Sequence, residues 1–191
     1  MTSASNGPGG EEDIHVLVVK FLGWFAHLQH WMDNVIAWRF FQDRMPNAAN
    51  LVWERAVSRI NDKERIKLFL AIAKDIGTDA ELDSVATVYA GLKELRDKVA
   101  HSAKFIDYGD GRLTISKSII TSFRDDDPDR TKIDRHQLSK AIRSCNWIEA
   151  QMIYVIFQHE PIADSLSSHK IPKPARTPDQ WDWDGDCDIV L

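Results

Sequence analysis

The fold is decided by residues 11–42, which read EEDIHVLVVKFLGWFAHLQHWMDNVIAWRFFQ. One apolar row recurs there at alternating spacings of four and three, comprising Leu17, Phe21, Trp24, Leu28, Trp31, Val35 and Trp38. A second row lies beside it, comprising Val18, Leu22, Phe25, Met32, Ile36 and Phe40. This periodicity predicts one long helix that packs on other helices. Because the apolar surface is wide enough to need cover on two sides, the helix should lie at the centre of a bundle or form part of a dimer interface.

Four further helices are predicted after Pro46, which ends the first unit: 50–60, 63–76, about 80–102 and 134–158. Asp62 is the expected N-cap of the helix 63–76, and Gly77 is its expected stop. Thr78 or Asp79 is the expected cap of the helix that follows. The chain therefore reads mainly as a succession of amphipathic helices.

Helical periodicity stops after residue 102. Gly109-Asp110-Gly111 stands between Phe105 and the apolar run 113–120, and Asp-Gly between such runs is a strong hairpin signal. Residues 124–130 contain three consecutive aspartates and Pro128, and we predict a solvated loop there. The predicted fold is all-α, a helical bundle with a long N-terminal helix and a small β-hairpin insertion at about 104–120.

The 191 residues suffice for one domain with a sizeable core. We expect it to span 11–160, after a disordered N-terminus at 1–10 that is polar and rich in glycine. Residues 161–191 have no hydrophobic periodicity and are predicted to be a flexible acidic tail. Docking of its two tryptophans, Trp181 and Trp183, on a partner is the alternative interpretation.

Composition excludes several classes of protein. The net charge of −5 gives no overall attraction to nucleic acid, although basic groups that act on RNA need only cluster locally. Cys145 and Cys187 form no CxxC pair, so neither a zinc site nor a disulfide framework is expected. We therefore expect a cytoplasmic protein with reduced cysteines. Lys20 and His27 interrupt the apolar stretch 14–28, which predicts no transmembrane helix and no membrane partner.

The segment most informative for function is LKELRDKVAHS, residues 92–102. Arg96 can neutralise a phosphate that gains negative charge, and His101 can transfer a proton near neutral pH. Asp97 precedes His101 by four residues, so its carboxylate could orient the imidazole and favour the protonated form. We therefore take Arg96, Asp97 and His101 as the candidate catalytic residues for RNA cleavage without a metal ion or cofactor.

An arginine and a polar residue followed a few positions later by a histidine resembles the signature of the HEPN family (higher eukaryotes and prokaryotes nucleotide-binding domains). The resemblance covers about 58–102 and implies a helical bundle that forms a homodimer, with both motifs facing one groove. It further implies RNA as substrate and a role in toxin–antitoxin or antiviral defence systems, with an antitoxin or other protein as partner. The family often has asparagine at the position of Asp97, and an aspartate there puts negative charge beside the phosphate.

Arg96 and His101 would point about 140° apart on one straight helix, since they are five residues apart at 3.6 residues per turn. Either the helix opens near Ser102, or two chains contribute to one site. Other interpretations also remain. Arg96 could pair with nearby carboxylates, Lys93 with Asp97, and His101 could stabilise a helix C-terminus. The protein would then be a non-catalytic helical assembly protein, or a bundle that binds a small ligand between its helices.

Overall fold

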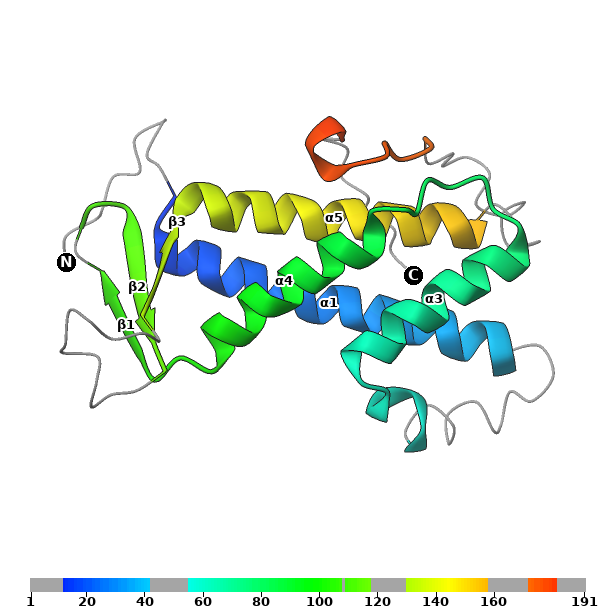
Figure 1. Cartoon of the computed structure of the whole chain (residues 1–191), viewed down its shortest axis with the longest axis horizontal. Helices are drawn as coiled ribbons and strands as arrows, with labels where there is room; N and C mark the ends of the chain where they lie inside the picture. Colours follow the sequence, from blue (N-terminus) through cyan, green and yellow to red (C-terminus); the bar gives the residue numbers. More distant parts are fainter. Residues whose placement is uncertain (1–11, 42–54, 108, 118–129, 158–171, 182–191) are drawn as a thin grey trace, which may run out of the picture.

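The computed structural model describes residues 12–41, 55–107, 109–117, 130–157 and 172–181. Its helices are α1 (Ile14–Phe41), α3 (Asp62–Ile76), α4 (Val85–Ala100) and α5 (Arg135–Phe157). The strands are β1 (Lys104–Asp107), β2 (Arg112–Ser116) and β3 (Thr131–Asp134), and single 3-10 turns occupy η1 (Val57–Arg59) and η3 (Pro178–Gln180). Figure 1 shows α1 and α5 side by side along the long axis, with α4 and α3 crossing one face and the strands at one end.

Helix α1 lies at the centre of the bundle, as its two apolar rows predict. It contacts α3, α4 and α5. Phe21, Phe25, Leu28 and Met32 are almost completely buried, and they come from both rows. Trp24 and Trp31 of the first row are only partly buried, while the side chain of Trp38 lies outside the described residues. The wide apolar surface of α1 is thus covered mainly within the chain itself.

The helix boundaries agree with the prediction at some ends and differ at others. Gly77 ends α3 with φ of 74°, a left-handed conformation that glycine adopts without strain. The predicted N-cap Asp62 is wrong, because Asn61 caps the helix by accepting the N–H of Glu64 on its side chain. Asp62 is instead the first helical residue, and its carboxylate is left for contacts with other helices.

Helix α4 begins at Val85, five residues later than predicted. The hydroxyl of Thr78 accepts the N–H of Ala80 in a local turn instead of capping a helix. Ala80 and Leu82 still pack against the core from this turn. These two apolar residues therefore reach the core from a turn, where a helix was predicted. The predicted helix 50–60 falls partly outside the described residues (50–54); in the described part Arg55 is helical and the 3-10 turn η1 follows.

The predicted hairpin is present, and it belongs to a three-stranded antiparallel sheet in the order β1-β2-β3. Gly109 and Gly111 have φ of 76° and 75°, so the turn uses conformations that favour glycine. The expectation of an all-α fold is therefore incomplete: the chain is mostly helical with a small sheet. Strand β3 was missed because it spans only four residues directly before α5, and only Ile133 of the strand is buried.

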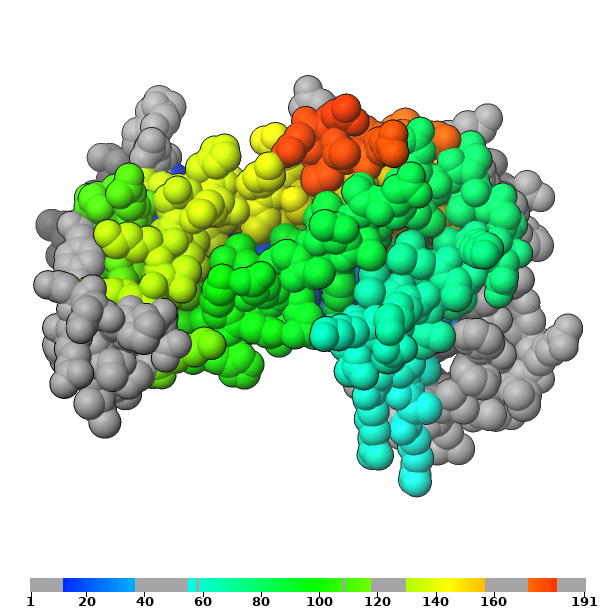
Figure 2. Space-filling view, viewed as in Figure 1, coloured from blue at the N-terminus to red at the C-terminus, as the bar shows by residue number. Residues whose placement is uncertain are grey.

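Part of the predicted tail, residues 172–181, packs against the helices, which corrects the expectation of flexibility for this segment. The Ala175 carbonyl accepts hydrogen bonds from Trp147 Nε1 at 2.7 Å and Gln151 Nε2 at 3.1 Å. Ser84 donates to the Arg176 carbonyl, and Trp181 is only 9% exposed. We call residues 172–181 the strap; Figure 2 shows it in red over α5. Residues 1–11, 158–171 and 182–191 lie outside the described residues.

No helix within the described ranges is long and apolar enough to cross a membrane.

Candidate functional site

Arg96 is held on the inner side of α4 by carboxylates and an aromatic ring. Its Nη2 lies 2.6 Å from Asp62 Oδ2 of α3, and its Nη1 lies 3.0 Å from Asp97 Oδ1. The guanidinium also lies over the ring of Phe25 in α1, 5.1 Å from its centre, in cation–π geometry. The side chain remains about one-quarter exposed. Arg96 therefore lies at the surface with a fixed orientation and with two carboxylates already bound.

These contacts belong to a chain of alternating charges across three helices. Arg65 Nε lies 2.5 Å from Asp33 Oδ1 of α1, and Arg65 Nη1 lies 2.8 Å from Asp62 Oδ1. At the other end, Lys93 Nζ lies 2.5 Å from Asp97 Oδ2. Three carboxylates (Asp33, Asp62, Asp97) thus alternate with three cations (Arg65, Arg96, Lys93), and we call these six residues the charge relay. Its formal charge is zero, so each partly buried charge has a partner of opposite sign.

Asp62 is the central residue of the charge relay, a role that no local pattern in the sequence indicates. It bonds two arginines and also accepts the amide of Gln29 from α1 at 2.6 Å. The Asp62–Arg96 contact joins residues 34 positions apart, so local spacing cannot predict it. The pairing of Lys93 with Asp97 is confirmed, because residues four apart on a helix face each other.

Electrostatics differ at the two ends of the relay. Burial tends to raise the pKa of Asp97, but the hydrogen bond from Lys93 and the nearby charges of Arg96, Lys93 and His101 outweigh it, so the pKa is lowered. Burial raises the pKa of Asp33 despite the opposing effect of Arg65. Asp97 is therefore ionised at neutral pH and holds negative charge beside Arg96.

His101 lies at the C-terminal end of α4, away from Arg96. Helix α4 ends at Ala100, and the backbone N–H of His101 bonds to the carbonyl of Asp97 at 3.1 Å. Because this bond continues the helical path to His101, the angle of roughly 140° between the directions of Arg96 and His101 still applies. Arg96 points toward α1 and α3, whereas His101 is exposed. One chain brings Arg96 and Asp97 together but does not bring His101 to the guanidinium.

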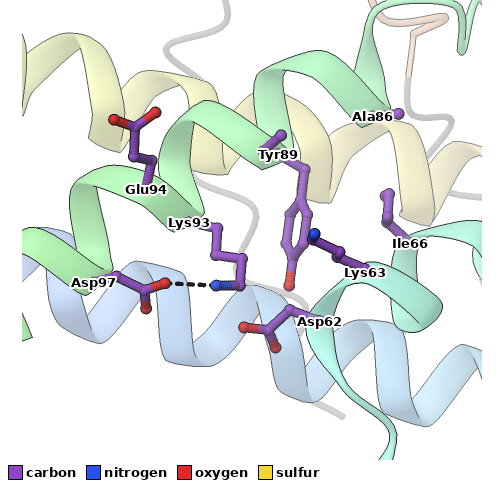
Figure 3. Close-up of a pocket in the computed structure, with 9 residues that line it drawn as sticks. Asp62, Lys63, Ile66, Ala86, Tyr89, Lys93, Glu94 and Asp97 are labelled. Atoms are coloured by element: carbon purple, nitrogen blue, oxygen red, sulfur yellow. Dashed lines mark hydrogen bonds and ion pairs between the residues drawn. The ribbon is translucent and has the colours of Figure 1, made fainter.

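A pocket of about 270 Å³ opens between α3 and α4 beside the relay. Figure 3 shows the ring of Tyr89 projecting from α4 toward α3 into this pocket, with Asp62 and Lys63 on the α3 side. Lys93 and Asp97 line it on the α4 side, and Ile66, Ala86 and Ala90 supply apolar wall. Burial and the negative charge of Asp62 raise the pKa of Tyr89 to about 12. Its hydroxyl is therefore neutral at physiological pH.

A second polar cluster lies on α1. Trp31 Nε1 donates to His27 Nε2 at 2.9 Å, and the ring of Trp24 packs edge-on against His27. The same His27 nitrogen lies 2.9 Å from Glu149 Oε1 of α5. His27 thus contacts neighbours on α1 and α5 while its side chain remains 47% exposed. Within the part of the chain that the structure describes, no three His, Cys, Asp or Glu residues are grouped to hold a metal ion.

Comparison with known proteins gave no assignment: no protein-family model, curated protein or solved structure matches this chain.

Proposed function

We propose that this chain is a HEPN-like RNA-binding protein that acts, as a homodimer, as a metal-independent endoribonuclease of a toxin or antiviral defence system. The observation that supports it best is the arrangement at the end of α4. A fixed, partly exposed guanidinium adjoins Asp97, and an exposed imidazole follows where the helix ends. The defence role and a protein partner such as an antitoxin rest on the family resemblance.

The chemistry follows from these groups. The 2′-hydroxyl of RNA attacks the adjacent phosphorus, so an O2′–P bond forms and the P–O5′ bond breaks. The 2′-hydroxyl proton passes to a base, and the leaving O5′ takes a proton from an acid. His101 serves as base or acid, and Arg96 stabilises the extra negative charge on the phosphate. Since the two side chains diverge within one chain, His101 of one protomer acts beside Arg96 of the other.

The test is RNA cleavage in the presence of EDTA. We expect His101→Ala to lower the cleavage rate by about 100-fold or more, because general acid–base catalysis contributes that much. His136→Ala is the matched control, since His136 is also exposed and lies on α5, outside the motif. The control should cleave at the wild-type rate. If the His101 variant retains full activity while circular dichroism shows both variants folded, the mechanism is wrong.

A second function, non-catalytic assembly through α1, is favoured by the apolar residues that α1 leaves uncovered. Val16 and Val19 are 44% and 69% exposed, near the partly buried Trp24. In that case a charge at this surface, as in Val19→Glu, would change the oligomeric state measured by light scattering. The same protein would not cleave RNA, and His101→Ala would behave as the wild type.

A further inference from the structure

The pocket between α3 and α4 contains a buried polar group without a partner. Tyr89 is 2% exposed, and its hydroxyl has no hydrogen-bond partner among the described residues. Gln29 donates one amide N–H to Asp62, and its amide lowers the pKa of Tyr89 as a nearby donor does, so what the hydroxyl lacks among the described residues is an acceptor for its proton. A buried hydroxyl without its hydrogen bonds destabilises the fold, so such groups usually have a partner. Figure 3 shows the hydroxyl directed between Lys93 and Asp62, where a bound molecule could pair with it.

The other groups in the pocket define which molecule fits. Each Asp97 oxygen accepts from one cation, and a carboxylate oxygen can accept about two hydrogen bonds, so acceptor capacity remains. Lys63 is exposed at the rim and can reach a phosphate. Ala86, Ala90 and Ile66 form an apolar wall. The carboxylate of Glu94 also lines the pocket and is paired with Lys98. The ligand therefore needs an apolar face, hydrogen-bond donors for a carboxylate and an acceptor for the Tyr89 hydroxyl, and Lys63 can pair with an anionic group at the rim.

The volume of the pocket further limits which ligands fit. The pocket of about 270 Å³ is below the range of about 300–1,000 Å³ typical of sites for drug-sized ligands. It therefore suits one flat ring system, while a folded oligonucleotide would extend past its rim. A nucleobase with an exocyclic amino group has all the required features: a π face, N–H donors and a ring nitrogen or carbonyl acceptor. Uracil lacks the amino group, so it offers the Asp97 carboxylate fewer donors.

We propose that the pocket between α3 and α4 is a subsite for one unpaired RNA base bearing an exocyclic amino group, bound between Tyr89, Asp97 and the apolar wall at Ala90. This inference rests on the proposed RNA-binding function and adds to it a preference for the base beside the cleaved bond. Lys93 and Asp97 belong to both the charge relay and the pocket. The subsite therefore lies directly next to Arg96.

The test measures binding of adenosine, cytidine, guanosine and uridine 5′-monophosphates to the full chain by calorimetry in EDTA. We expect the amino-bearing nucleotides to bind at least about ten times more tightly than uridine monophosphate, because their amino group donates an additional hydrogen bond to a charged carboxylate. Ala90→Leu should weaken their binding about ten-fold by filling the pocket. Ala71→Leu is the matched control, because Ala71 is an exposed alanine on α3 that does not line the pocket. Tyr89→Phe should weaken binding about five-fold.

The outcomes separate the subsite from the nuclease when the same proteins are also assayed for RNA cleavage. Selective binding that Ala90→Leu abolishes, without cleavage by the wild type, keeps the subsite and rejects the endoribonuclease. Cleavage without mononucleotide binding rejects the subsite alone. Equal binding of uridine monophosphate, or wild-type affinity in Ala90→Leu, also overturns the proposal.

Discussion

The side chain of Arg96 is held in one orientation, but the groups that hold it also offset its charge. Asp62 and Asp97 hold its guanidinium, and Phe25 lies beneath it. Such a group needs little reorganisation to meet a phosphate, which favours catalysis. The two carboxylates, however, offset its charge, so a phosphate must compete with them for the remaining N–H donors. Under the proposed function, RNA binding would therefore depend on charges from outside the relay, and the exposed Lys63 at the pocket rim is one such charge.

The Tyr89 hydroxyl should make the protein sensitive to alkaline pH. Its pKa is about 12 in the folded chain and near 10 in an unfolded one. Between these values the unfolded state releases a proton that the folded state keeps. The free energy of unfolding therefore falls by up to about 1.4 kcal/mol per pH unit above pH 10. Tyr89→Phe removes this dependence and, since the hydroxyl is unpaired, should not weaken the fold at pH 7.

Urea unfolding of wild type and Tyr89→Phe at pH 8, 10 and 11 measures this effect. Lysines also titrate in this range, but they are the same in both proteins and cancel in the difference. The variant should gain relative stability with each step above pH 10. Parallel pH profiles would contradict the burial of the Tyr89 hydroxyl.

Local spacing predicted the contact within α4 but could not predict the contacts that other helices make with it. The contact of Lys93 with Asp97 follows from their separation of four residues on one helix. The approach of Asp62 depends on how α3 crosses α4, which is set by packing on α1. The role of Tyr89 could not be predicted either, because nothing in the sequence indicates that its hydroxyl lacks an acceptor.

Among the elements, α3 has the clearest start signal, and that signal yields a prediction. Asn61 accepts the N–H of Glu64 on its side chain at 3.1 Å. Asn61→Ala leaves this N–H without its partner and should cost about 1 kcal/mol of unfolding free energy. Asn61→Ser is the matched control, since serine caps equally well and should stay within a few tenths of a kcal/mol. Chemical denaturation measures both variants, and equal loss in the two would show that the cap is unimportant.

The elements also show why sequence patterns succeed or fail. Helix α1 was predictable because two apolar rows extend from Leu17 to Phe40, far longer than any strand pattern. Gly77 was predictable because its left-handed conformation suits glycine. The start of α4 was not, because Ala80 and Leu82 pack against the core from a turn. Strand β3 forms because it pairs with β2, and a contact between residues so far apart in sequence cannot be predicted from the four residues of β3 alone.

In the molecule as a whole, the strap packs on the helical bundle, far from the sheet. Polar contacts with two parts of the chain hold it. Trp147 and Gln151 of α5 donate to the Ala175 carbonyl, and Lys140 of the same helix pairs with Asp179. Ser84, before α4, donates to the Arg176 carbonyl. Trp147 is completely buried, so its indole N–H depends on the strap for a partner. The segment therefore belongs to the hydrophobic core, although its composition resembles that of a tail.

Truncation after residue 171 should consequently destabilise the whole bundle. The buried Trp147 N–H loses its acceptor, at a cost of about 1–3 kcal/mol, and the burial of Trp181 is lost, at about 2 kcal/mol more. For a chain of this length, each kcal/mol lowers Tm by about 2–4 °C, so a decrease of roughly 6–20 °C follows. Thermal unfolding by circular dichroism measures it, and tryptophan fluorescence should shift to the red as Trp147 meets water. Truncation after Trp181 keeps every contact of the strap and is the control, whereas an unchanged Tm after the longer deletion would show that the strap adds nothing to the core.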